Sequence, residues 1–252
     1  MFKSKKIMMS GDSFRDEYCI DFDGTNDLID GTATNHITTG DFTFTAWIKA
    51  PDFHDVRILS KWESDNKRWN WCFNTANPPK MHYFNKINTD YRGSYTGTIN
   101  MDNFKNQWVH IAFSSTRPSG EEEDLGTSTG YINGEYDNEA DQTAHTLSNT
   151  GNMSIASYRT DTTTATYPMK LSEVTIYDKA LNHAEIQTIY NGRQPFNHME
   201  SSFSSNLKAW YRMGDGLEHA NGTTVYDMSS NTNNATMTNM DAGSDYESTG
   251  GK

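Results

Sequence analysis

The sequence predicts an all-β protein, a two-sheet antiparallel sandwich with one short helix on its C-terminal side. The first observation is that Thr, Asn, Ser, Asp and Gly, which favour turns and exposed strands, are abundant among the 252 residues. The second is a series of short alternating segments divided by turn signals. The third is that aromatic residues reach 12% while hydrophobic residues make up only 34%, which indicates thin layers packed by aromatic side chains.

The first half of the chain contains five strand candidates. YCIDF, residues 18–22, runs into an Asp-Gly turn. FTFTAWI, residues 42–48, places its two Phe side chains on one face and Trp47 on the other, which predicts that both faces are covered. The others follow at the spacing of an antiparallel sandwich, at residues 56–62, 70–74 and 80–85.

The second half continues the pattern. QWVHIAFSS, residues 107–115, alternates strictly, and Asn133-Gly134 within GYINGEY, residues 130–136, is the strongest hairpin signal in the chain. Two further strands are predicted at residues 153–158 and 169–178.

The predicted helix lies in LNHAEIQTIYNGR. Asn182 is the expected N-cap, and Glu185, three residues on, completes a capping box. Ile186 and Ile189 share one face, and Gly192 is the expected stop. We expect this helix to lie across one end of the sandwich.

Charge and hydropathy exclude several classes of protein. The chain carries 21 Lys and Arg against 33 Asp and Glu, a formal net charge of −12, so no nucleic-acid partner and no membrane insertion are predicted. No apolar run approaches the ~18 residues of a membrane span, and the basic N-terminal arm, residues 1–17, lacks the apolar region of a signal peptide. We therefore expect the chain to fold where it is made, or to leave by a route without a cleavable signal.

The two cysteines lie in strand-like segments. Buried free thiols are the favoured interpretation of Cys19 and Cys72, and a single bridge between them stays open.

Six blocks, in order, carry a family resemblance: YCIDFDGTNDLID, FTFTAWIKA, ILSKW, QWVHIAFSS, GYINGEY and KLSEVTIYDKALNHAEIQTIYNG. Together they resemble the laminin-G-like or concanavalin A-like jelly-roll family, of the LamG and pentraxin type. The resemblance implies a jelly-roll sandwich over residues 18–202. It does not fix the function, because this superfamily includes lectins, adhesion modules, glycan hydrolases and structural domains.

The segment 203–240 also has strand character, and in many proteins of this type a similar segment precedes the first block. Three arrangements stay open: an edge of the same sandwich, which we favour, a strand added to a neighbouring subunit, or the start of a second repeat. Residues 241–252 are predicted to be a flexible tail.

No catalytic residues are predicted. Glycan hydrolysis needs two carboxylates held beside the scissile bond, and the strands lack alternating acids. The acidic run 121–124 is interpreted as a solvated loop, and there is no nucleophile elbow, zinc motif or phosphate loop. We therefore expect a protein that is not an enzyme.

No metal site is predicted either, although the resemblance leaves calcium open as a cofactor. Two sets of oxygen donors are candidates, Asp23, Asn26 and Asp27, and Asp227, Asn231 and Asn233. Neither set alone supplies the six to eight oxygens that calcium prefers, and Asx turns explain the same residues. The eight scattered histidines are predicted to be surface residues or core residues with satisfied hydrogen bonds.

Aromatic residues between positions 61 and 97 are the candidates for glycan binding, because sugar rings present C–H faces that stack on aromatic rings. Trp62, Trp69 and Tyr91 are the predicted ligand-binding members, while Trp71 and Tyr83 are assigned to the core. A contact with another protein explains the exposed rings equally well.

The features together favour a non-catalytic lectin-like module of a virion, such as a phage decoration or fibre protein. Its expected partners are other virion proteins or further copies of itself, together with host glycans, and its expected location is the virion. The alternatives are a secreted or cell-surface adhesion module and a glycoside hydrolase of the same fold.

Overall fold

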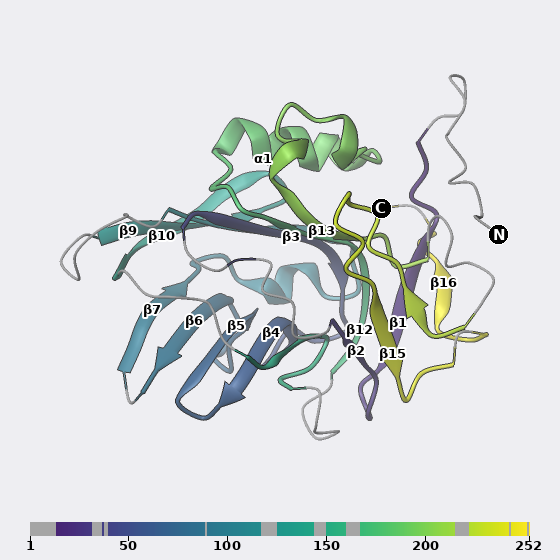
Figure 1. Ribbon diagram of the computed structural model, residues 1–252, viewed down its shortest axis with the longest axis horizontal. Helices are drawn as coiled ribbons and strands as arrows, with labels where there is room; N and C mark the ends of the chain where they lie inside the picture. The colour runs from purple at the N-terminus through teal and green to yellow at the C-terminus, as the bar shows by residue number, and fades with distance from the viewer. Residues whose placement is uncertain are drawn as a thin grey trace.

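Two eight-stranded antiparallel sheets pack face to face as a sandwich (Figure 1). The computed structural model describes residues 14–31, 37, 40–88, 90–116, 125–143, 150–159, 167–214, 222–241, 243–250 and 252. The predicted all-β sandwich with one short helix is confirmed, and its architecture is that of a jelly roll.

The first sheet, called sheet A, is built around a long central strand. Its strands, in spatial order, are β10 (Glu135–Thr143), β9 (Leu125–Ile132), β8 (Val109–Ser115), β3 (Phe42–Lys49), β12 (Pro168–Tyr177), β1 (Tyr18–Asp23) and β16 (Tyr246–Ser248), and β13 (Leu207–Tyr211) also pairs with β12. Strand β12 pairs with β1 through its first half and with β13 through its second half. A bulge separates the two halves, and there Glu173 adopts a left-handed backbone (φ 53°).

The second sheet, called sheet B, carries the hairpins of the first half of the chain. Its strands, in spatial order, are β14 (Thr224–Val225), β15 (Ala235–Thr238), β2 (Leu28–Asp30), β11 (Asn152–Ile155), β4 (Arg57–Ser64), β5 (Lys67–Phe73), β6 (Met81–Ile87) and β7 (Asp90–Thr96). Strands β4 to β7 form a meander of antiparallel neighbours.

Aromatic rings fill the core between the sheets. Tyr83 of sheet B stacks on Phe113 of sheet A with ring centres 4.5 Å apart, and Trp71 lies 5.7 Å from Phe44. All four side chains are fully buried. Trp71 and Tyr83 are therefore core residues, as predicted.

Helix α1 (His183–Tyr190) covers the outer face of sheet A, on the side away from sheet B (Figure 1). The predicted capping box is confirmed, because Asn182 accepts from the backbone N–H of Glu185 while the Glu185 side chain accepts from the N–H of Asn182. Short 3-10 helices complete the fold: η1 (Met101–Phe104), η2 (Asn191–Arg193), η3 (His198–Glu200) and η4 (Ser204–Asn206). The prediction that the second face of β3 is covered is also confirmed, since Trp47 packs 5.8 Å from the Tyr190 ring.

The C-terminal segment pairs with its own sandwich. Strand β13 adds to sheet A, whereas β14 and β15 extend sheet B beyond β2. Residues 241–252 do not form the flexible tail that the sequence predicts, because they contain β16, which pairs with β1. The tail forms a strand since β1 has a free edge there that can accept its backbone hydrogen bonds.

Cys19 and Cys72 are buried free thiols, as favoured. Most of the N-terminal arm, residues 1–13, and the acidic run 121–124 lie outside the described residues. Among the helices that the structure describes, none has the length and apolar character to cross a membrane.

Candidate functional site

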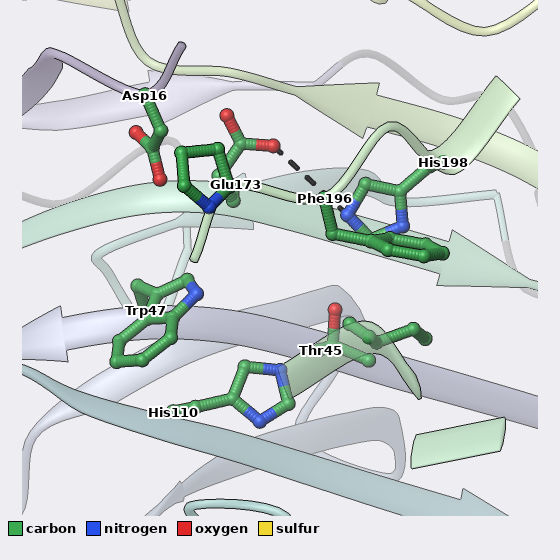
Figure 2. A pocket seen from close by; sticks show the side chains of 9 residues that line it. Asp16, Thr45, Trp47, His110, Glu173, Phe196 and His198 are labelled. Atoms are coloured by element: carbon green, nitrogen blue, oxygen red, sulfur yellow. Dashed lines mark ion pairs between the residues drawn. The ribbon is translucent and has the colours of Figure 1, made fainter. Parts of the chain in front are cut away.

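A small pocket opens on the outer face of sheet A, beside α1 and the segment that follows it (Figure 2). Its lining is mixed polar and aromatic: Asp16, Thr45, Trp47, His110, Glu173, Ile189, Pro195, Phe196 and His198. Its enclosed volume is about 10 Å³, room for one water molecule. A sugar ring does not fit there.

Glu173 is the central group of this pocket. Its carboxylate accepts from Trp210 Nε1 at 2.5 Å and from Arg212 Nε at 3.2 Å. It also lies 4.0 Å from His198 Nε2, the contact marked by the dashed line in Figure 2. Burial, reinforced by the charge of Asp16, raises the pKa of Glu173 to about 8 even though Arg212 lowers it. The carboxyl therefore holds its proton to a higher pH than an exposed glutamate does.

The contacts of Glu173 tie separate parts of the fold together. They join the bulge of β12 to β13, and His198, which is hydrogen-bonded to the Tyr177 hydroxyl at 2.5 Å, adds η3 to the same network. A raised carboxyl pKa is also a mark of catalytic acids, but both oxygens of Glu173 already accept hydrogen bonds and the pocket is too small for a saccharide. We interpret the pocket as a structural network.

His110 departs from the prediction that every histidine is a surface residue or a satisfied core residue. It is 1% exposed, and neither ring nitrogen has a hydrogen-bond partner among the described residues. The register of β8 against β3 places its ring 5.3 Å from the Trp47 ring, and the Tyr190 ring of α1 lies 5.9 Å away. Burial lowers the pKa of His110 to about 3, so the ring is neutral.

The outer face of sheet B offers a different kind of surface. Five side chains lie in register across β11, β4, β5, β6 and β7: Asn152, Trp62, Arg68, Lys86 and Tyr91. Strands lie ~4.8 Å apart, so the row from Trp62 to Tyr91 is roughly 14 Å long. Trp62 is partly exposed and Tyr91 is 61% exposed.

Rings and guanidinium groups alternate at one end of this row. Arg68 Cζ lies 4.4 Å from the centre of the Trp62 ring and 5.6 Å from that of Tyr158. Arg159 Cζ lies 5.1 Å from Trp62, and Arg57 Cζ lies 5.1 Å from Tyr158. These five residues, Arg57, Trp62, Arg68, Tyr158 and Arg159, form an arginine–aromatic cluster. Each of its two rings lies within cation–π distance of two guanidinium groups.

A backbone turn brings Tyr158 onto the sheet. After β11 ends, Ala156 adopts a left-handed conformation (φ 66°) and the chain turns across the outer face. Ser60 Oγ of β4 then donates to the carbonyl oxygens of Ser157 at 2.7 Å and Tyr158 at 2.9 Å. The segment is therefore fixed over β4, with the Tyr158 ring 4.6 Å from the Trp62 ring.

Tyr91 stands at the other end of the row. Its ring meets Phe84 edge-on with centres 5.7 Å apart, and Lys86 Nζ lies 5.8 Å from it. Phe84 is itself partly exposed. The row therefore combines an exposed ring at β7 with the arginine–aromatic cluster at β4 and β5.

Comparison with known families decides what kind of domain carries this face. The family model described as the concanavalin A-like lectin/glucanases superfamily (Laminin_G_3) matches residues 23–187. The chain belongs to this superfamily. No curated protein matches the sequence.

Solved structures support the superfamily fold. A candidate carbohydrate-binding protein from Bacteroides ovatus is similar with a TM-score of 0.65 and 18% identity, over 94% of this chain and 60% of that one. The native heptameric SAP-like pentraxin from Limulus polyphemus is similar with a TM-score of 0.50 and 16% identity, over 69% of this chain and 82% of that one. This chain thus spans about three-fifths of the length of the Bacteroides protein.

The structure separates the three aromatic residues predicted to bind a ligand. Trp62 and Tyr91 lie in the same row on the outer face of sheet B. Trp69 does not: it is 5% exposed and stacks on Phe44 with ring centres 5.2 Å apart. The prediction of an exposed Trp69 is wrong, because alternation along β5 places it on the core face with Trp71.

Both sets of calcium-donor candidates form turns. Asp27 Oδ2 accepts from the N–H of Asp23 at 2.9 Å, and Asp23 Oδ1 accepts from the N–H of Thr25 at 2.6 Å. Asp227 accepts four hydrogen bonds, among them those from the backbone N–H groups of Trp210 and Asn233. These carboxylates hold backbone in place, and a calcium ion at either set stays a prediction.

Two features of the face were not predicted from the sequence. Arg68 is opposite Trp62 across the β4–β5 hairpin, a placement that the strand parity of KWESDNKRW would have indicated. Tyr158 reaches the face through the turn at Ala156, for which the sequence carries no Gly or Asn signal.

Proposed function

We propose that the chain binds saccharides on the outer face of sheet B without cleaving them. The observation that carries the proposal is the row from Trp62 to Tyr91, which presents aromatic rings and polar donors on a face that α1 does not cover. Ligand sites of this kind combine apolar ring surface with a few placed polar groups. Several sugar rings would fill the roughly 14 Å between its ends.

The family supports the same choice. Lectins and glucanases share the superfamily, and the similar Bacteroides protein is a candidate carbohydrate-binding protein. The row of Asn152, Trp62, Arg68, Lys86 and Tyr91 contains no carboxylate, whereas glycoside hydrolysis needs a pair. The row therefore carries groups that can bind a saccharide but lacks the carboxylate pair that cleavage needs.

A glycan array tests the proposal. We expect wild-type protein to bind a defined group of glycans, and Tyr91→Ala to weaken that binding about two- to tenfold, as loss of one aromatic contact implies. Trp62→Ala should weaken it further, because Arg68 and Arg159 lose their support. Tyr136→Ala is the matched control, since Tyr136 is 49% exposed but lies on β10 of sheet A.

Three results would change the proposal. Binding to no glycan at all would overturn it. Loss of binding in EDTA would move the site to a calcium-holding loop, because the row itself has no metal ligands apart from an amide. Release of reducing ends from a bound glycan would favour a glycoside hydrolase.

The setting of the domain stays a prediction. A virion decoration or fibre protein and a cell-surface adhesion module both fit a saccharide-binding sandwich. Mass spectrometry of purified virus particles distinguishes them: finding the chain at stoichiometric abundance supports the virion, and its absence there leaves the adhesion module.

A further inference from the structure

The strands that carry the proposed binding face differ in charge from the rest of the chain. Residues 56–96, which contain β4 to β7, hold seven Lys and Arg against three Asp and Glu. The whole chain holds 21 against 33. The segment that forms this face is therefore net positive on a strongly acidic protein, and such a bias favours an anionic ligand.

The arginine–aromatic cluster places this charge on the ring faces. Both Trp62 and Tyr158 have two guanidinium carbons within 5.6 Å of their ring centres. A neutral sugar that stacked on Trp62 would have to displace Arg68 or Arg159. A guanidinium that lies over a ring has its N–H groups at its planar edge, and the geometry of those groups matches the two oxygens of a carboxylate.

Buried polar atoms gather beneath the same cluster. Asn70 and Ser154 are 0% exposed and flank Ser60 in one cross-strand row. Among the described residues, the side-chain oxygen and nitrogen of Asn70 and the Ser154 hydroxyl have no hydrogen-bond partner. The same holds for the Nε atoms of Arg57 and Arg68. Buried polar atoms left unmet in this way are costly, which marks the cluster as short of polar partners within the described residues.

The existing partner of Arg68 is weak. Asp65 lies 3.4 Å from Arg68 Nη1, but its side chain is 81% exposed. Exposed pairs of this kind contribute little. A ligand carboxylate could therefore replace Asp65 without breaking a buried interaction.

From these observations we infer that the ligand is a saccharide bearing a carboxylate, such as a uronic or sialic acid unit, held by Arg68 and Arg159. The inference rests on the proposed saccharide binding and adds its chemical class. The row toward Tyr91 would hold the neighbouring sugar units, while the carboxylate lies at the arginine–aromatic cluster.

The test uses the full chain on an array of neutral, carboxylated and sulfated glycans, followed by calorimetry with the best carboxylated glycan and with its carboxyl-reduced, neutral form. We expect enrichment of carboxylated glycans and at least tenfold weaker binding of the reduced form. Binding of the carboxylated glycan should weaken further as salt is raised.

Four variants locate the contact. Arg159→Gln should weaken binding of the carboxylated glycan roughly ten- to a hundredfold, and Arg68→Lys should also weaken it, because lysine keeps the charge but loses the planar fork. Asp65→Asn should strengthen binding, since it removes the competing carboxylate. Arg15→Gln is the charge-matched control, because Arg15 is exposed and pairs with Glu17 ahead of β1.

The outcomes separate this inference from the proposed function. Equal binding of neutral and carboxylated forms, or a preference for sulfated glycans, would overturn the inference and leave saccharide binding intact. Binding of poly-L-glutamate as tight as that of the glycan would overturn the saccharide in favour of an acidic peptide. No binding to any glycan would overturn both.

Discussion

At the scale of single residues, Glu173 gives the fold a dependence on pH. Burial raises the pKa of Glu173 from 4.5 to about 8, so the folded state keeps a proton that the unfolded chain releases. Its contribution to stability is therefore complete below pH 4.5 and lost as the pH rises to about 8. Burial acts in the opposite sense on His110 and His198, whose pKa values fall from 6.5 to about 3, so their contribution is lost as the pH falls below 6.5.

These three groups together predict a stability maximum near pH 6.5. Between pH 6.5 and 8 the free energy of unfolding should drop by roughly 2 kcal/mol, measured by urea unfolding at a series of pH values. Glu173→Gln keeps hydrogen-bonding atoms but cannot ionise, so it should flatten this alkaline limb and steepen the acidic limb between pH 4.5 and 6.5, where ionisation of Glu173 in the unfolded chain no longer opposes the two histidines. An alkaline limb of the same slope in Glu173→Gln would assign the loss to another group.

Trp69 shows where residue-level prediction failed and why. The sequence assigned Trp71 to the core and left Trp69 exposed, although residues two apart on a strand share a face. Strand parity alone would have buried Trp69 and turned Arg68 outward, opposite Trp62. The identity of the outer-face row was thus available from the sequence once the hairpin register was known.

At the scale of elements, the strands and the helix were predictable because their signals are local. The hairpin at Asn133 and the capping box at Asn182 depend on residues within a few positions of one another. The pairing of β13 with β12 and of β16 with β1 joins segments far apart in sequence. No local sequence pattern indicates such partners, so the sequence alone predicts a tail for residues 241–252.

Strand β16 should protect Cys19. The Cys19 thiol lies 3.5 Å from the carbonyl oxygen of Glu247, and Trp108 Nε1 donates to the carbonyl oxygen of Thr249 at 2.9 Å. Burial raises the pKa of Cys19 to about 12 and keeps the thiol unreactive. Truncation after residue 245 should lower the melting temperature by several degrees and expose one thiol to Ellman's reagent.

The second cysteine provides the control for this truncation. Cys72 lies on β5 of sheet B and is fully buried, so it should stay unreactive in the folded truncated chain. Adding Cys19→Ser to the truncated chain should abolish the reaction. Two reactive thiols would mean global unfolding, and none would mean that β16 does not cover β1.

At the scale of the whole molecule, the C-terminal third is divided between both sheets. β13 lies in sheet A, whereas β14 and β15 lie in sheet B, and the largest hydrophobic cluster, between the sheets, includes Tyr211 and Met237 from these strands. Neither sheet is complete without them. The chain should therefore unfold as one cooperative unit and not as a sandwich with a separate appendage.

Unfolding of two core variants tests this cooperativity. Leu207→Ala in β13 and Met237→Ala in β15 remove buried side chains, and each should lower the free energy of unfolding by about 2–5 kcal/mol. Because both sheets contain tryptophans, Trp47 and Trp210 in sheet A and three in sheet B, tryptophan fluorescence and far-UV circular dichroism should report one shared transition that both variants move. A new early transition confined to one probe, with the main midpoint unchanged, would show instead that the C-terminal strands form a separate unit and that the sandwich is complete without them.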